Sequence, residues 1–142
     1  MAGLSAAAKD TNVSWVETHD GKMECRKVNM GISKARIVLN NGEKKTIQID
    51  DINSYAMYGR VFTKLPLYRD NKPTDQMIFM ELVRTRGNLN LYRVENFNSE
   101  SIELNDKVSS YFVYDGNRML LALDEKSLPN ISKIFGIRYS YM

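Results

Sequence analysis

Apolar and polar residues alternate with a period of two along most of the chain, which is typical of strands with one buried face. The clearest case is residues 35–49, where Ile and Leu side chains recur at every second position on either side of Asn41-Gly42. An Asn-Gly pair tolerates positive φ at both central turn positions, as a type I′ turn needs. We therefore expect an antiparallel hairpin with one dry face and one wet face.

Further hairpins are expected from the same signals. Residues 12–17 and 21–28 flank Asp20-Gly21, and residues 89–94 return after a turn at 84–88. The last hairpin joins two strongly apolar segments around Asp115-Gly116-Asn117. Its strands, 109–114 and 118–123, are expected to bury Tyr111, Phe112, Val113, Met119, Leu120 and Leu121.

The middle of the chain predicts two longer strands. Residues 55–68 are extended around Gly59, and Pro66 indicates a sheet edge or the end of a strand. Residues 69–75 (RDNKPTD) are polar and rich in turn formers, which predicts a mobile loop. Residues 76–83 are apolar at both alternating sets of positions, which indicates a central strand covered on both sides.

Only residues 127–135 have the spacing of a helix. Ser127 can cap its start, Pro129 suits its first turn, and Gly136 can end it. The fold class predicted is therefore mainly β, with antiparallel hairpins forming a sandwich or a half-open barrel and one short C-terminal helix. No repeat or linker is visible, so residues 9–142 are expected to form a single domain.

The first eight residues resemble the end of a secretory signal peptide. Ala6 and Ala8 occupy the −3 and −1 positions of an A-x-A cleavage site before Lys9. A basic start and a long apolar run are missing, so a flexible tail left by cloning is the alternative. The signal-peptide interpretation predicts export to the periplasm or cell surface. No stretch reaches 18 apolar residues, so no transmembrane segment is expected.

Composition and charge narrow the chemistry. The net charge of +3, from 20 basic and 17 acidic residues, is mild, and we expect no nucleic-acid partner. Cys25 and His19 are the only residues of their types, which excludes an intramolecular disulfide and a zinc site of several Cys or His ligands. No cofactor or metal is predicted. Cys25 is interpreted as a strand residue and His19 as an exposed turn residue.

Eight tyrosines are the most suggestive feature of the composition. Tyrosine favours strands, and it also favours interfaces because it buries area while keeping a polar tip. Ordinary strand composition accounts for most of them. As candidate binding residues we nevertheless single out Tyr55, Tyr58, Tyr92 and Tyr111.

Three runs of sequence carry a family resemblance: ARIVLNNGEKKTIQIDDINSYAMYGRVF, MELVRTRGNLNLYRVE and YFVYDGNRMLLAL. In hairpin order, and with a short final helix, the chain resembles a class of small exported β-rich proteins common in Bacteroidetes. The resemblance spans roughly residues 33–136 and implies a β-rich exported protein. It brings no catalytic residues, because the class has no assigned activity. The incomplete signal peptide and the proline-containing segment 69–75 depart from the pattern.

Three functions are consistent with these features. The first is a non-enzymatic cell-envelope module that binds another protein, through sheet edges or Tyr-rich strands. The alternative is a β-barrel that carries a lipid or another small apolar ligand. The third, an enzyme, would need carboxylates such as Asp50, Asp51 and Glu81 to converge in a cleft. We expect the protein not to be an enzyme.

Overall fold

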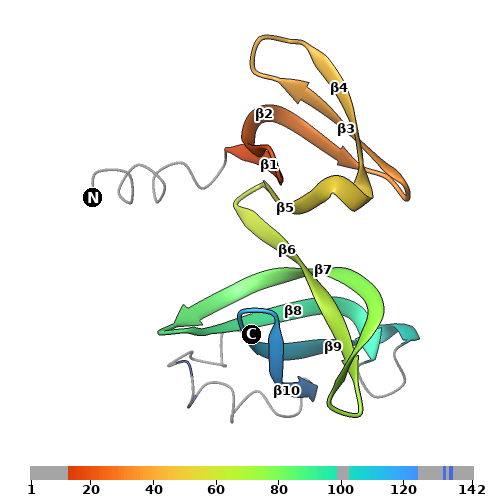
Figure 1. Ribbon diagram of the computed structural model, residues 1–142, viewed down its shortest axis with the longest axis vertical. Coiled ribbons are helices and arrows are strands. Elements are labelled where there is room, and N and C mark those ends of the chain that lie inside the picture. Colours follow the sequence, from red (N-terminus) through yellow and green to blue (C-terminus); the bar gives the residue numbers. More distant parts are fainter. Residues whose placement is uncertain (1–12, 99–102, 125–132, 134, 136–142) are drawn as a thin grey trace. The chain divides into compact units, whose positions relative to one another are not determined.

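The computed structural model describes residues 13–98, 103–124, 133 and 135 (Figure 1). The described chain is mainly antiparallel β-structure, as predicted. Hydrogen bonds join the strands in the order β10-β9-β8-β7-β6-β5-β1-β2-β3-β4, which is open because β10 and β4 lie at its two ends. The chain divides into two compact units, Met1–Lys64 (unit 1) and Leu65–Met142 (unit 2).

Unit 1 consists of four strands joined by consecutive hairpin turns, then one 3-10 turn, then β5 and the start of β6. Strand β5 pairs with β1 and with the start of β6, while β1, β2, β3 and β4 pair in chain order. The elements are β1 (Ser14–Thr18), β2 (Gly21–Met30), β3 (Lys34–Leu39), β4 (Lys44–Gln48), the 3-10 helix η1 (Ile49–Asp51), β5 (Ile52–Met57) and β6 (Arg60–Arg69).

The sheet of unit 1 must curl, because a very short connection joins two strands, β4 and β5, that are far apart in the strand order. Strands β4 and β5 are four steps apart in the strand order, which in a flat sheet would separate them by about 19 Å. The connection from Gln48 to Ile52 contains only η1, and four extended residues reach at most about 14 Å. Curling gives the sheet an inner side, where the buried residues include Val16, Cys25, Val28, Ala35, Ile37, Ile52 and Tyr55.

The 35–49 hairpin is confirmed, but its predicted type I′ turn is wrong. The N–H of Gly42 donates to the carbonyl of Leu39 at 2.9 Å, and the N–H of Leu39 donates to the carbonyl of Glu43 at 2.8 Å. Only Gly42 has positive φ (+90°), so the loop is a type I turn followed by a bulge. Asn41 instead accepts the N–H of Glu43 on its side-chain oxygen, at 2.8 Å. This local hydrogen bond favours the turn with negative φ at Asn41.

Positive φ at both central positions occurs at two other turns. Tyr58 and Gly59 have φ of +57° and +75° between β5 and β6, and Asp70 and Asn71 have +53° and +63° between β6 and β7. The mobile loop expected at 69–75 is therefore wrong: two residues make the turn. Asp and Asn adopt positive φ more readily than other non-glycine residues. Asp70 and Asn71 can therefore connect β6 to β7 by themselves, without a longer loop.

Unit 2 consists of the end of β6 and four more strands. Pro66 lies within β6, after the last residue that pairs with β5, Thr63. In the strand order, β7 lies between β6 and β8, so its central position is confirmed. The predicted burial of β7 on both sides is not confirmed, since only Met80 of this strand is fully buried. The further strands are β7 (Lys72–Arg86), β8 (Leu89–Asn98), β9 (Glu103–Asp115) and β10 (Arg118–Asp124).

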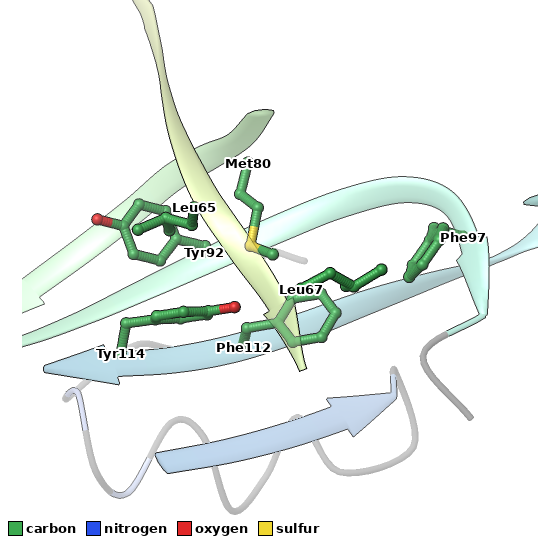
Figure 2. Close-up of a cluster of buried hydrophobic side chains, with 7 residues drawn as sticks. All are labelled: Leu65, Leu67, Met80, Tyr92, Phe97, Phe112 and Tyr114. Carbon is green, nitrogen blue, oxygen red and sulfur yellow. The ribbon is translucent and has the colours of Figure 1, made fainter. Parts of the chain in front are cut away.

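The sheet of unit 2 also curls. Strands β6 and β9 are three steps apart, about 14 Å in a flat sheet, yet the hydroxyl of Tyr114 donates to the carbonyl of Pro66 at 2.6 Å. Aromatic rings fill the concave side, with Tyr114 edge-on to Tyr92 at 5.7 Å between ring centroids. Figure 2 shows the buried cluster, formed by Leu65, Leu67, Met80, Tyr92, Phe97, Phe112 and Tyr114.

A second buried cluster lies on the opposite face of β8 and β9. Leu91 and Tyr92 are consecutive in β8 and so point to opposite faces. Tyr111 and Val113 of β9 join Leu91, and Phe135 packs with them. The predicted burial of Tyr111, Phe112 and Val113 is confirmed, and Met119 is partly buried against the first cluster. The predicted burial of Leu120 and Leu121 is wrong, because their relative surface exposure is 43% and 39%. Both lie in β10, which is at one end of the strand order.

The predicted helix at 127–135 falls almost wholly outside the described residues and stays a prediction. Of this segment only Lys133, which is exposed, and Phe135, which is buried, are described. The predicted signal remnant at residues 1–8 lies outside the described residues as well. The expectation of one domain over 9–142 also stays a prediction.

Candidate functional site

A groove with a volume of about 380 Å³ opens on the inner side of unit 1. Lys45 and Ile47 of β4 pair with the buried residues Ile37 and Ala35, so their side chains point to the inner side of the curled sheet. They meet the β1–β2 hairpin across the groove. The lining consists of residues 18–23, Lys45, Ile47 and Asp51.

The groove lies beside an unpaired sheet edge. Strand β4 ends the strand order, so within the described residues only β3 pairs with it. Leu39 and Glu43 are joined by a backbone hydrogen bond, and antiparallel pairs alternate between bonded and non-bonded. Lys45 and Ile47 thus bond to β3. The backbone N–H and C=O groups of Lys44, Thr46 and Gln48 point away from β3, along the free edge.

The chemistry of the groove is an apolar base with charges of both signs at its rim. Met23 and Ile47 are half-buried. His19 and Asp20 are exposed at the turn, with 3.2 Å between Nε2 and Oδ1. Lys22 is held above the ring of Trp15, with Nζ 4.0 Å from the ring centroid. This combination suits an extended chain that places apolar side chains inward and polar ones outward.

The four predicted tyrosines do not form one exposed surface. Tyr55, Tyr92 and Tyr111 are buried, and Tyr55 stacks on Phe62 with 4.9 Å between ring centroids. Burial raises the pKa of Tyr55, and the nearby charge of Arg60 opposes that shift. Tyr58 alone is exposed, at 82%.

The candidate carboxylates have different surroundings. Asp50 and Asp51 are exposed in unit 1. Glu81 belongs to unit 2, where 2.8 Å separates its Oε1 from Nη2 of Arg93. Burial acts to lower the pKa of Arg93, but the hydrogen bond that Arg93 donates to Glu81 and the charges of Glu81 and Glu95 raise it overall. Glu81 thus has a structural partner within the sheet.

Cys25 has the surroundings of a core residue. It is 3% exposed, and burial raises the pKa of its thiol. A raised pKa disfavours the thiolate, which is the nucleophilic form. Across the described part of the chain, no three His, Cys, Asp or Glu side chains gather in an arrangement that could hold a metal ion. The described residues also contain no helix with the length and apolarity needed to cross a bilayer.

Sequence reasoning missed the groove residues Met23, Lys45 and Ile47 as a set. Each lies on the inner face of its strand, opposite a buried residue: Met23 pairs with Val16, Lys45 with Ile37 and Ile47 with Ala35. Comparisons with protein-family models, with curated proteins and with solved structures gave no match.

Proposed function

We propose that this chain is an exported, non-enzymatic module of the cell envelope that binds an extended segment of a partner protein. The segment pairs as a new strand with β4, and its side chains enter the groove of unit 1. The observation that carries the proposal is the free edge of β4 lying directly beside a groove with an apolar base. Strand addition to an exposed edge is a common mode of peptide recognition.

Backbone groups supply the affinity in this mode. Lys44, Thr46 and Gln48 offer outward N–H and C=O groups, inferred from the pairing of β3 with β4. Side chains supply the specificity, because every second residue of the added strand faces the groove. Met23 and Ile47 favour an apolar residue there, while Lys44 and Lys45 favour acidic residues near one end of the segment.

Two lysines on β4 also explain why the edge would not pair indiscriminately. Charged side chains on edge strands, especially lysine, oppose pairing between copies of the same strand. Lys44 and Lys45 are both exposed. A partner with complementary acidic residues would be selected over a second β4.

The filled concave side of unit 2 favours this function over the ligand-carrying barrel. Seven buried side chains, four of them aromatic, occupy the space where a carrier would hold its ligand (Figure 2). The open strand order points in the same direction, because small carriers close their sheets.

A displayed library of random peptides of about twelve residues tests the proposal. We expect selection on the intact chain to enrich peptides with alternating apolar residues. The binding of these peptides should be lost in Thr46→Pro, which removes the outward N–H that edge pairing uses. Thr46→Val is the matched control, since it keeps the N–H and the strand propensity. Equal binding to Thr46→Pro, or no enrichment at all, would refute strand addition at β4.

A further inference from the structure

In unit 1, the outer face formed by residues 26–30 of β2 and by strands β3 and β4 carries only basic and neutral side chains. Ala35 and Ile37 point inward, so their neighbours in β3, Lys34 and Arg36, point outward. Residues paired opposite each other share a face, which adds Lys27 and Lys44, both paired with Val38. We call Lys27, Lys34, Arg36 and Lys44 the basic face; all four side chains are exposed.

Acidic residues are absent from β3, from β4 and from the part of β2 that carries this face; Glu24, earlier in β2, lies next to the inward Cys25 and so points outward. None occurs in residues 26–30, in β3 or in β4, and the nearest are Glu24 and Glu43 beyond these ends. The remaining outward residues are neutral: Asn29, Val38, Thr46 and Gln48. The net charge of the whole chain is only +3, so this face concentrates positive charge.

A hollow and an exposed apolar side chain lie at one end of the basic face. The β2–β3 turn places Ile32 fully in solvent, at 102% relative exposure. The N–H of Gly31 donates to the carbonyl of Lys34 at 2.9 Å, which closes the turn. The hollow has a volume of about 340 Å³ and is lined by Asn29, Gly31, Ile32, Ser33, Lys34 and Arg36.

We propose that the basic face and Ile32 dock unit 1 onto an anionic lipid bilayer. Basic residues near a membrane surface are attracted to anionic headgroups, and an apolar side chain projecting beyond them can enter the boundary between headgroups and acyl chains. The hollow beside Ile32 presents Lys34 and Arg36 to a headgroup phosphate. Charge complementarity and the projecting isoleucine select a bilayer over other anionic partners.

A nucleic acid fits these observations less well. Single strands are bound by basic grooves that also carry aromatic side chains for base stacking. The basic face and the β2–β3 turn contain no aromatic residue. The apolar residue of the turn, Ile32, is fully exposed but has no aromatic ring on which a base could stack.

Co-sedimentation with vesicles tests the docking surface. We expect the intact chain to bind vesicles of phosphatidylcholine with about one-third phosphatidylglycerol, and not vesicles of phosphatidylcholine alone. Binding should fall as salt rises from about 0.05 to 0.5 M, because exposed charges are screened. Lys34→Glu with Arg36→Glu should weaken binding by at least about tenfold.

Three variants separate this surface from simple net charge and from the β4 edge. Lys45→Glu with Lys72→Glu matches the charge change of the double variant, but Lys45 points to the inner side and Lys72 is an exposed residue of unit 2, so vesicle binding should stay within about twofold of the intact chain. Ile32→Ser should weaken vesicle binding, and Ile32→Trp should show a blue-shifted emission on vesicles beyond any shift of Trp15. Equal losses in the two charge-reversed variants, no effect of Ile32→Ser, or preferential binding of single-stranded DNA would overturn the proposal.

Discussion

The hydroxyl of Tyr114 in β9 donates a hydrogen bond of 2.6 Å to the carbonyl of Pro66 in β6. Strands β7 and β8 lie between them in the strand order. The bond therefore ties two strands that a flat sheet would keep apart, and it closes the concave side over the aromatic cluster. Tyr68 also contributes, since its ring lies edge-on to that of Tyr114 with 6.2 Å between centroids.

Removing this hydroxyl should loosen unit 2. Tyr114→Phe leaves the carbonyl of Pro66 without its donor, and we expect the free energy of unfolding to fall by about 1–2 kcal/mol. Urea unfolding followed by circular dichroism measures the change. Tyr58→Phe is the matched control, because the Tyr58 side chain is exposed and its phenol should contribute nothing measurable. Equal stability of Tyr114→Phe and the intact chain would contradict the structural role of the bond.

The raised pKa of Tyr114 leads us to expect a loss of stability at alkaline pH. Burial, together with the neighbouring Tyr68 and Tyr92, raises the pKa of Tyr114 above its ordinary value. An unfolded tyrosine ionises near pH ~10, so above that pH the unfolded state releases a proton that the folded state retains. The contribution of Tyr114 is complete below pH ~10 and is lost as the pH rises further. The stability difference between the intact chain and Tyr114→Phe should therefore narrow between about pH 10 and 11.5, as urea titrations at several pH values would show; a constant difference would contradict this linkage.

The ion pair of Arg93 with the more buried Glu81 should contribute more to stability than its pair with the more exposed Glu95. Its Nη2 lies 2.8 Å from Oε1 of Glu81 and 2.9 Å from Oε1 of Glu95, while the exposed fraction of the two glutamate side chains is 15% and 51%. We expect Glu81→Gln to cost about 1–3 kcal/mol of unfolding free energy and Glu95→Gln less than about 0.5 kcal/mol. Urea unfolding of both variants at one salt concentration makes the comparison. Equal losses would show that burial does not set the strength of these pairs.

Tyr58 occupies a turn conformation that disfavours aromatic residues. Its φ is +57° and its side chain is exposed. Asparagine adopts this region more easily, so Tyr58→Asn should raise the free energy of unfolding by about 0.5–1 kcal/mol. Thermal and urea unfolding measure the gain, with Tyr58→Phe as the control that keeps the strain. A loss of stability would mean that contacts of the ring outweigh the backbone strain.

Much of the fold was predictable because alternation directly encodes which residues share a face. The hairpin at 35–49 follows from apolar residues at every second position on either side of Asn41-Gly42, and the hairpin at 109–123 follows from two apolar segments that flank Asp115-Gly116-Asn117. Turn geometry was less accessible. Asn41-Gly42 is the typical type I′ sequence, yet it forms a type I turn in which the N–H of Glu43 donates to the Asn41 side chain. Tyr58-Gly59, which is not a typical type I′ sequence, has positive φ at both positions.

The candidate sites were harder to predict because they depend on how the sheets curl. The sequence pattern indicated that Tyr92 and Tyr111 lie in strands and that Tyr111 is buried, but not that Tyr92 is buried as well or that the two rings lie on opposite faces of the sheet. Lys45 and Met23 line the same groove because the short η1 segment requires the sheet of unit 1 to curl, which brings β4 toward the β1–β2 hairpin. The basic face, in contrast, follows from sorting the charges of β2, β3 and β4 by face, which a sequence supplies once the register is known.

Amide hydrogen exchange in the isolated protein, resolved by residue with NMR, tests the open edge of β4 most directly. Lys45 and Ile47 should exchange slowly because their N–H groups bond to β3, whereas the N–H of Thr46 should exchange at least about a hundredfold faster. Slow exchange at Thr46, comparable to its two neighbours, would show that another part of the chain already covers this edge and would contradict the proposed strand addition.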